Sequence, residues 1–363
     1  MQILINIIVF ILMLSAIIII HEFGHFIAAK FFNVYCGAFS IGMGPKIFSK
    51  KGKETEFQIR ALPIGGFVTM AGEADQEDVE EFKDVPEERT LKGKRTYQKV
   101  IIFLAGVFMN FVLAIVVMLI LNLTVGTLPV NTAKIGAIVS DSAASHYGLK
   151  VGDVITNIED NTSKKSFVIS SYDDITNDLS QKALGVTAKT TSLDVTVTRG
   201  NKSVVVKMVV SYNASTERYV LGIQQATRRM NFTESIRETF VSIGTMSVAI
   251  IKALEQLVIN FSTTVKKMSG PVGIYQITAQ VTESGQVQTL FYLLAMLSVN
   301  IGVFNLLPIP GLDGCQTLFA IIEGIIGREL PTKAKYVLQL IGLGLVLLLM
   351  LVVTFQDVSK LLG

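Results

Sequence analysis

The chain has 363 residues, of which half are hydrophobic and 17% are charged. This composition, with a mean hydropathy of +0.53, excludes a large water-soluble protein and indicates a polytopic α-helical membrane protein with about four transmembrane helices. A net charge of only +3, without a basic patch interleaved with aromatic residues, excludes nucleic acid as the partner.

The first predicted element is a membrane-spanning helix that ends in a metal-binding motif. Residues 1–20 carry no charge and are long enough to cross a bilayer, and we interpret them as a retained helix because neither a basic start nor a small-residue cleavage site accompanies them. His21 and His25 follow, and on a helix this spacing places both imidazoles on one face, where they can bind one metal ion. Glu22 is placed to take a proton from a water molecule at that metal.

A sheet-like segment and a second span follow. Residues 39–70 contain glycine breaks and alternating stretches that predict a membrane-associated β-hairpin, which either lies on the surface or dips into the bilayer beside a protein cavity. Residues 100–125 are uncharged and predict the second spanning helix. Asn110 within it is interpreted either as a helix–helix hydrogen-bonding residue or as a group that lines the site. Twelve Lys and Arg residues in 30–99 place this loop in the cytoplasm and the N-terminus outside.

Residues 129–225 change character and predict one soluble domain. Charged residues return in this stretch. Apolar and polar residues alternate over 193–198, which predicts a strand that turns and continues as a second strand. About a hundred residues is a normal size for a single domain. Residues 142–155 resemble the helix–turn–strand of a PDZ domain of the bacterial protease type. Such a domain binds an extended peptide or a C-terminus at a sheet edge, and the predicted topology places it outside the membrane. His146 is expected to be a surface histidine of this domain.

The C-terminal part is predicted to contain interfacial helices and two further spans. Residues 232–268 are predicted to be helical and amphipathic. Their longest charge-free run, 239–251, is too short to cross a bilayer, so an interfacial helix, or a helix pair that braces the PDZ domain, is expected there. The third span ends in 305–314, where prolines and glycines break the helix beside Asp313. An aspartate at membrane depth is a functional candidate, and the alternative is a helix-capping residue in a cytoplasmic turn. Residues 336–356 predict a fourth span, so that both termini lie outside.

The sequence therefore divides into four predicted parts. Residues 1–128 form an N-terminal membrane part with the histidine motif, the hairpin and the second helix, and 129–225 form the PDZ domain. Residues 226–283 form the interfacial helices, and 284–363 form a C-terminal membrane part that contains Asp313 and the fourth helix.

A catalytic zinc site needs three protein ligands and one open position, and a carboxylate is expected to complete this one. Of the three histidines, His146 lies in the soluble domain, and the two cysteines are too far apart in sequence for a thiolate site. The first and third spans both run inward and carry polar residues at their cytoplasmic ends, so Asp313 is expected to meet His21 and His25. Such a site hydrolyses peptide bonds, with Glu22 passing its proton to the leaving amine.

The position of this site restricts its substrates. A chain that reaches a metal within the membrane must already lie there and present an unwound strand, and residues 56–68 of the hairpin are placed to pair with it as a sheet edge.

Together these features resemble the site-2 protease family of intramembrane zinc metalloproteases, in particular its bacterial regulator-of-sigma-factor type with a single PDZ domain. The resemblance rests on the predicted PDZ domain and on segments 21–26, 269–274, 305–310 and 312–314. The resemblance implies Zn²⁺ bound by His21, His25 and Asp313, with Glu22 as the base. It also implies a protein of the bacterial inner (cell) membrane whose active site lies toward the cytoplasm.

The resemblance further implies the class of substrate. Single-span membrane proteins, such as anti-sigma factors or remnant signal peptides, would be cut after a first cleavage outside the membrane. Asn305 would position the substrate, and Pro308, Gly66 and Phe67 are further candidate substrate contacts. The chain departs from the family in two places, because 314–316 reads Gly-Cys-Gln where Gly-Gly-His is common, and 106–110 has valine where Gly-Pro-x-x-Asn has proline.

Three other functions fit part of the sequence. A catalytically silent membrane scaffold or peptide-binding adaptor of the same fold is the main alternative, and the intact ligand and base residues argue against it. A transporter would also contain broken helices and intramembrane carboxylates, but it predicts inverted repeats, which the sequence lacks. A metalloprotease with its active site outside would need a downstream glutamate ligand, for which Glu323 is the nearest candidate.

Overall fold

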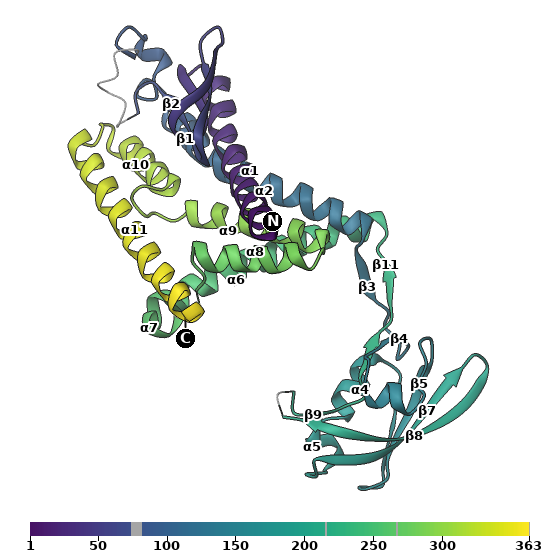
Figure 1. Cartoon of the computed structure of the whole chain (residues 1–363). Helices are drawn as coiled ribbons and strands as arrows, with labels where there is room; N and C mark the ends of the chain where they lie inside the picture. Colours follow the sequence, from purple (N-terminus) through teal and green to yellow (C-terminus); the bar gives the residue numbers. More distant parts are fainter. Residues whose placement is uncertain (74–81, 215, 266–267, 363) are drawn as a thin grey trace. The chain divides into compact units, whose positions relative to one another are not determined.

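The structure, a computed structural model, describes residues 1–73, 82–214, 216–265 and 268–362. These residues form two compact units, which can be followed by colour along the chain in Figure 1. The larger unit combines Met1–Thr124 with Thr233–Gly363, and the smaller unit is Val125–Phe232. The chain thus leaves the larger unit once and returns to it.

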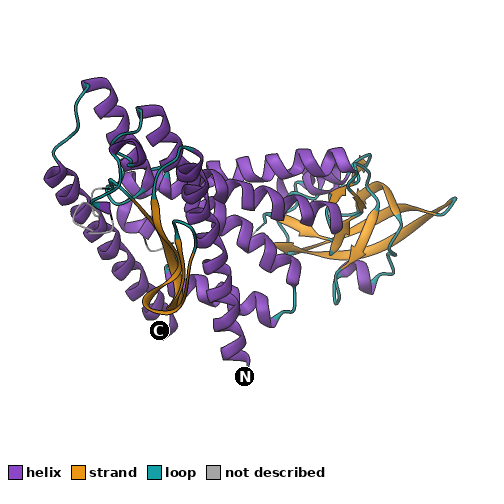
Figure 2. Ribbon diagram, turned by 90° about the horizontal axis from the view of Figure 1, so that it is seen from above, coloured by secondary structure: helices purple, strands orange, loops and turns teal. Residues whose placement is uncertain are grey.

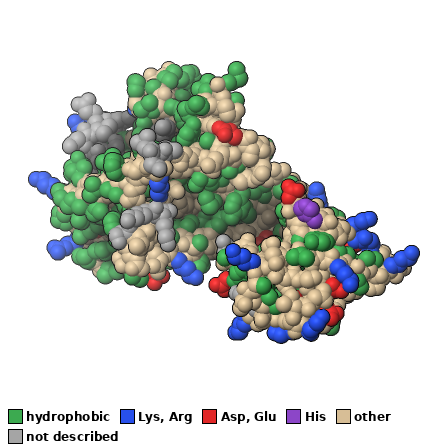
Figure 3. All heavy atoms as spheres, turned by 60° about the horizontal axis from the view of Figure 1, so that its bottom comes forward, with side chains coloured by type: hydrophobic (Ala, Val, Ile, Leu, Met, Phe, Trp, Pro, Cys, Tyr) green, Lys and Arg blue, Asp and Glu red, His purple; other side chains and the backbone are tan. Residues whose placement is uncertain are grey.

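Long apolar helices dominate the larger unit. Five of the described helices are long and apolar enough to cross a membrane, namely α1 (Gln2–Phe31), α2 (Thr96–Thr124), α6 (Phe232–Ile259), α9 (Val287–Asn305) and α11 (Thr332–Leu362). Hydrophobic side chains cover much of the surface of this unit (Figure 3), as lipid-facing helices require. The chain therefore combines several helices suited to a membrane with β-rich regions.

Helix α6 lies in the segment 226–283, for which interfacial helices are predicted. It is one continuous helix of 28 residues and contains the charge-free run 239–251. Its charges gather in the first two and the last two turns, so its length and composition allow it to span. Its described contacts run along α2, where the Asn122 amide donates to Thr239 at 3.0 Å.

Helices α1, α2 and α9 pack around the middle of the larger unit. Gly24 of α1 lies so close to the backbone of Ala105 on α2 that a Cβ would overlap the Ala105 carbonyl oxygen. The small residue lets the two helix backbones approach closely, as is common between membrane helices. On the other side of α2, Ser298 of α9 donates to the Asn110 carbonyl oxygen at 2.8 Å. These contacts fix α2 between its two neighbours.

The predicted hairpin is present as strands β1 (Cys36–Lys51) and β2 (Glu56–Met70), which are orange in Figure 2. Both strands bend, so that Phe39 pairs with Val68 on one side and with Phe57 on the other. The last part of β2, residues 66–70, is consequently an edge of this small sheet. Ser15, near the middle of α1, donates a hydrogen bond to the Pro63 carbonyl oxygen, which ties the hairpin along the helix.

Shorter helices complete the larger unit and hold its ends together. Asp357, near the end of α11, accepts hydrogen bonds from the backbone N–H groups of Gly270 (2.7 Å) and Gly273 (2.8 Å), at the start of α8. At the other end of α8, Glu283 accepts from the Asn6 amide at 2.8 Å. The shorter helices are η2 (Glu87–Arg89), α7 (Phe261–Val265), α8 (Pro271–Glu283) and α10 (Asp313–Ile326).

The smaller unit is built on an antiparallel five-stranded sheet in the order β6-β5-β7-β8-β9. As the sequence predicts, β7 and β8 form a hairpin whose last pair is Arg199 with Lys202. Its strands are β3 (Thr127–Pro129), β4 (Ile135–Ile138), β5 (Val154–Asp160), β6 (Lys165–Val168), β7 (Thr190–Arg199), β8 (Lys202–Asn213), β9 (Arg218–Val220), β10 (Ile223–Gln225) and β11 (Thr227–Arg229). Its helices are α3 (Ala143–His146), α4 (Tyr172–Asp178) and α5 (Gln181–Leu184).

The core of the smaller unit follows from alternation along its strands. Leu193, Val195 and Val197 of β7 are fully buried, while the residues between them are only partly covered. Strand β10 pairs with β4 outside the main sheet, and α4 lies beside it. His146, on α3, is exposed, as expected for a surface histidine.

A buried ion pair should make the stability of the smaller unit depend on pH. Asp153 is 1% exposed and accepts from Arg199 Nε and Nη2 at 2.8 and 2.7 Å. The hydrogen-bonded Arg199 guanidinium lowers the pKa of Asp153 below its ordinary value. Because the folded-state pKa is lowered, the stabilisation is complete above the unfolded-state pKa of about 3.9 and is lost as the pH falls through the folded-state value.

We therefore expect Arg199→Met to lower the unfolding free energy of this unit by about 1–3 kcal/mol at pH 7, since it leaves a buried carboxylate unpaired. The difference from the unmodified chain should shrink below about pH 4. Hydrogen exchange of the β5 and β7 amides, measured by mass spectrometry on the full chain in detergent, reports both effects. Lys207→Met is the control, because Lys207 is 80% exposed and 3.7 Å from Asp194. Equal exchange in the two variants at pH 7 would contradict the expectation.

Candidate metal centre

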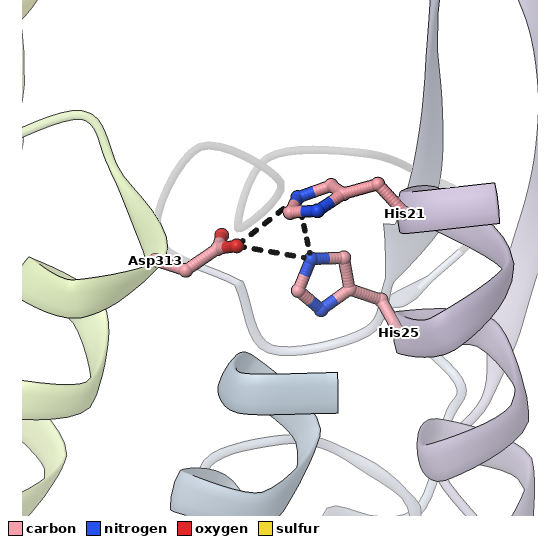
Figure 4. A group of neighbouring side chains, drawn as sticks. All are labelled: His21, His25 and Asp313. Atoms are coloured by element: carbon pink, nitrogen blue, oxygen red, sulfur yellow. Dashed lines mark hydrogen bonds and ion pairs between the residues drawn. The ribbon is translucent and has the colours of Figure 1, made fainter. Parts of the chain in front are cut away.

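The three residues that are predicted to bind the metal ion lie close together in the larger unit. His21 and His25 extend from α1 toward Asp313, the first residue of α10 (Figure 4). Asp313 Oδ2 lies 3.1 Å from His21 Nε2 and 3.3 Å from His25 Nε2, and the two Nε2 atoms are 3.2 Å apart. They form the only group of this kind, with three or more potential ligands from His, Cys, Asp or Glu, among the described residues.

The spacing of these atoms fits one tetrahedral metal ion. Bonds of about 2.0–2.1 Å from a zinc ion place two tetrahedral ligand atoms about 3.3 Å apart. The three observed separations all lie close to that value, and two imidazole nitrogens with one carboxylate oxygen are a ligand set that zinc enzymes use. The residues therefore fit a catalytic zinc ion, with a fourth position left for water or substrate.

Helix α2 packs against both imidazoles and contacts their Nδ1 atoms, which orients the rings. His25 Nδ1 lies 2.8 Å from the Ile102 carbonyl oxygen, which can only accept, so Nδ1 carries the proton and Nε2 presents its lone pair to the metal position. His21 Nδ1 lies 3.1 Å from the side-chain amide of Asn110. Between these two contacts, a Cβ on Gly106 would overlap His25 Nε2 and lie 2.8 Å from His21 Cε1. The stripe of α2 at positions 102, 106 and 110 is thus the surface against which the histidines pack.

The broken segment between α9 and α10 delivers the carboxylate. Gly311 has a φ of +94°, in the region that favours glycine, and Leu312 is extended before α10 begins at Asp313. Gly314 lies against the carbonyl oxygens of Leu306 and Leu307, where a Cβ would overlap both. The start of α10 therefore packs directly on the end of α9. An ionised carboxylate in the first turn of a helix is also favoured by the helix dipole.

A hollow opens from the metal position toward strand β2. The Val68 backbone N–H donates a hydrogen bond to the Glu22 carboxylate, which lies between the metal-binding atoms and the edge of the sheet. Gly66 is next to Glu22, since its Cβ would lie 3.4 Å from Glu22 Cγ. The residues that line the hollow are His21, Glu22, His25, Phe67, Val68, Thr69, Met70, Glu73, Phe103, Asp313 and Gln316.

The other residues singled out from the sequence lie in different places. Phe67 lines the hollow, whereas Asn305 ends α9 and Pro308 lies in the following turn, outside the set of lining residues. Glu323 is ion-paired with Lys335 and accepts from the Leu330 N–H at 2.9 Å. It is not part of the metal-binding group, which disfavours the alternative ligand set.

Sequence reasoning missed three contacts of the site. The Ile102 carbonyl and the Val68 N–H are backbone groups, which any residue type supplies, so no sequence signal marks them. The packing role of Gly106 was also missed, although its four-residue spacing from Asn110 places both on one face of a helix.

The chain is similar over nearly its whole length to known proteins. The model of a family described as peptidase family M50 matches residues 9–349. A protein of Clostridium perfringens, provisionally named a zinc metalloprotease, is 33% identical, and the match covers 95% of this chain and 96% of that protein. The regulator of sigma-W protease RasP of Bacillus subtilis is 30% identical, over 98% of this chain and 99% of RasP. The similarity therefore extends over both units.

A methyl group on α2 should disrupt the metal centre. In Gly106→Ala the new Cβ occupies the space of the His25 imidazole and pushes both histidines from their positions, so we expect metal affinity to fall at least about tenfold. Gly244→Ala, on α6, is the matched control, because nothing lies within 4 Å of its added Cβ. Metal content of the two purified variants after dialysis against a chelator measures the difference. Full metal retention by Gly106→Ala would show that the histidines do not depend on this packing.

Proposed function

Because the chain belongs to peptidase family M50, the site-2 protease family, we propose that it is a zinc metalloprotease that hydrolyses peptide bonds within or near the transmembrane segments of single-span membrane proteins. The family membership confirms the resemblance drawn from the sequence. The observation that carries the proposal is the tetrahedral spacing of His21, His25 and Asp313, in which the two histidines lie, next to Glu22, on a helix suited to span a membrane.

The roles of the residues follow from their positions. His21, His25 and Asp313 would hold the metal ion. A zinc ion bound there supplies a Lewis acid for the peptide carbonyl and lowers the pKa of its water to about 7. Glu22 takes the proton of the attacking water and passes it to the leaving amine, and the Val68 N–H holds its carboxylate in place meanwhile.

The edge of β2 is the proposed binding surface for the substrate strand. Residues 66–70 pair with β1 on one side only, and Phe67 and Val68 of this edge line the hollow at the metal. An extended chain that adds to the edge would pass its backbone across Glu22 and the metal position. Gly66 leaves room for a close approach, and we place Asn305 and Pro308 among the contacts farther along the substrate.

The hairpin supports the interpretation in which it dips into the bilayer. The hairpin accepts a hydrogen bond from Ser15, near the middle of α1, and several of its apolar side chains are exposed. Such side chains are costly in water but not in lipid, and the end of β2, residues 67–70, lines the hollow of the site. The exposed apolar residues are Met43, Ile47, Phe48, Phe57, Ile59 and Leu62.

For the smaller unit we propose a PDZ domain that binds a peptide or a C-terminus. Gly148 and Gly152 of the matching segment both have positive φ, as the tight turn between helix and strand requires. A groove runs between α4 and the stretch that leads from β9 into β10, and β10 is paired with β4 alone among the described strands. An extended peptide can add to such an edge.

The proposed setting is the inner membrane of a bacterium. With α6 lying at the membrane surface and the other four long helices crossing it, both termini and the PDZ domain would lie outside, and the metal centre would face the cytoplasm. RasP is named for regulating sigma-W, which supports membrane-anchored regulators such as anti-sigma factors, together with remnant signal peptides, as the substrates of this chain.

A cleavage assay separates this function from that of a silent scaffold or adaptor. Glu22→Gln keeps the size of the side chain but removes the proton acceptor, so we expect cleavage of a model single-span substrate to fall at least about a hundredfold with zinc content unchanged. Reconstituted protein in lipid vesicles and a gel assay of the cut substrate measure the loss. Cleavage by Glu22→Gln at the original rate would refute the assignment of the base.

A second test concerns the third ligand. Asp313→Ala removes one of three metal-binding atoms, and we expect it to lose zinc and activity together. Glu323→Gln, on the same helix, should retain zinc because Glu323 is engaged with Lys335 instead. Elemental analysis of both variants gives the answer, and full zinc in Asp313→Ala with loss in Glu323→Gln would favour the alternative ligand set.

A further inference from the structure

Asn110 is the one side chain of α2 that contacts a predicted metal ligand through a polar atom in the described part of the chain. Its residue is fully buried, and its amide lies 3.1 Å from His21 Nδ1. Nδ2 of the amide faces the histidine, while Oδ1 is buried without a hydrogen-bond partner among the described residues. A buried amide in an apolar helix is costly unless it makes hydrogen bonds, so this contact needs a reason.

The chemistry of His21 decides which atom of the amide must face it. Its Nε2 is the nitrogen at the metal position, 3.1 Å from Asp313 Oδ2 and 3.2 Å from His25 Nε2. A neutral imidazole that binds a metal through Nε2 carries its proton on Nδ1, and this N–H must find an acceptor. Among the described residues, Asn110 makes the one polar contact with that nitrogen, so its Oδ1 is the required partner.

A half-turn of the amide satisfies this requirement at no cost in other contacts. The rotation exchanges Oδ1 and Nδ2, and Oδ1 has no hydrogen bond to the described residues that would be lost. His25 already shows the same arrangement, because its Nδ1 donates to the Ile102 carbonyl at 2.8 Å. The two acceptors lie on one face of α2, eight residues apart, and Gly106 midway leaves room for the rings.

We propose that Asn110 is a positioning residue of the metal centre, whose side-chain oxygen accepts the Nδ1 proton of His21 and so holds Nε2 toward the metal. The proposal rests on the proposed function, since it concerns the same zinc site. From the sequence, Asn110 is interpreted either as a helix–helix hydrogen-bonding residue or as a group that lines the site. Its contact with His21 favours the second interpretation. Ser298 holds the Asn110 backbone through its carbonyl oxygen, which fixes the height of the amide beside His21.

Two kinds of substitution test the proposal on the full-length protein in detergent. Asn110→Leu and Asn110→Ala remove the acceptor, and we expect zinc affinity to fall about tenfold to a hundredfold. Asn110→Asp keeps an acceptor at the same place and should bind zinc within about threefold of the unmodified chain, because a carboxylate also accepts from a ligating histidine. Asn122→Leu is the matched control, since Asn122 is a buried asparagine of the same helix that bonds Thr239 instead.

Zinc affinity is measured by competition with a chromophoric chelator, and the visible absorption of the cobalt(II)-loaded protein reports the geometry of the ligands. Weak binding and an altered cobalt spectrum in Asn110→Leu or Asn110→Ala, with both preserved in Asn110→Asp and Asn122→Leu, support the proposal. Unchanged affinity and spectrum in the acceptor-free variants overturn it, as does an Asn110→Asp variant that binds as weakly as Asn110→Ala. An unmodified chain that binds no zinc would instead overturn the proposed function together with this inference.

Discussion

The metal centre depends on how closely α2 approaches α1. Gly24 lies against the backbone of Ala105, and Gly106 lies against the imidazoles of both histidines, so any larger residue at either position would separate the helices. At this short distance the Ile102 carbonyl reaches His25 and the Asn110 amide reaches His21. Membrane helices gain little from burying apolar surface against each other, and close contact through small residues replaces that driving force.

The carboxylate is brought to the histidines by an interruption of helical structure. Between α9 and α10 the chain cannot remain helical, and its backbone groups are satisfied locally, as in the bond from the Leu312 N–H to the Ile309 carbonyl. Gly311 and Gly314 make the turn sharp enough for Asp313 to begin a new helix at the level of the histidines. Broken backbone is tolerated here because it borders the site rather than lipid.

The hairpin places a strand edge beside the metal centre, and a substrate chain can bind at this edge. Its edge at 66–70 contacts Glu22 through the Val68 N–H, while the opposite side of the same strand segment pairs with β1. Glu22, the proposed base, is therefore positioned by the surface that is proposed to hold the substrate, which would couple binding to catalysis. The aromatic contacts of Phe26 with Phe39 and Phe57 fasten this sheet to the helix that carries the ligands.

The sequence by itself determined the positions of the proposed ligands and base, because these depend on local spacing and on charge. His21 and His25 are four residues apart after an uncharged run, and the distribution of Lys and Arg was enough to predict that Asp313 would meet them. The same local signals predicted the β7–β8 hairpin, where alternation and a Gly turn fix the register.

Only the tertiary structure decided which faces of the helices meet and how the strands of the hairpin pair. In lipid the outward face of a helix is as apolar as the inward face, so no periodicity shows that Ile102, Gly106 and Asn110 face the histidines. The double pairing of Phe39, with Val68 and with Phe57, is a long-range arrangement that local alternation does not encode.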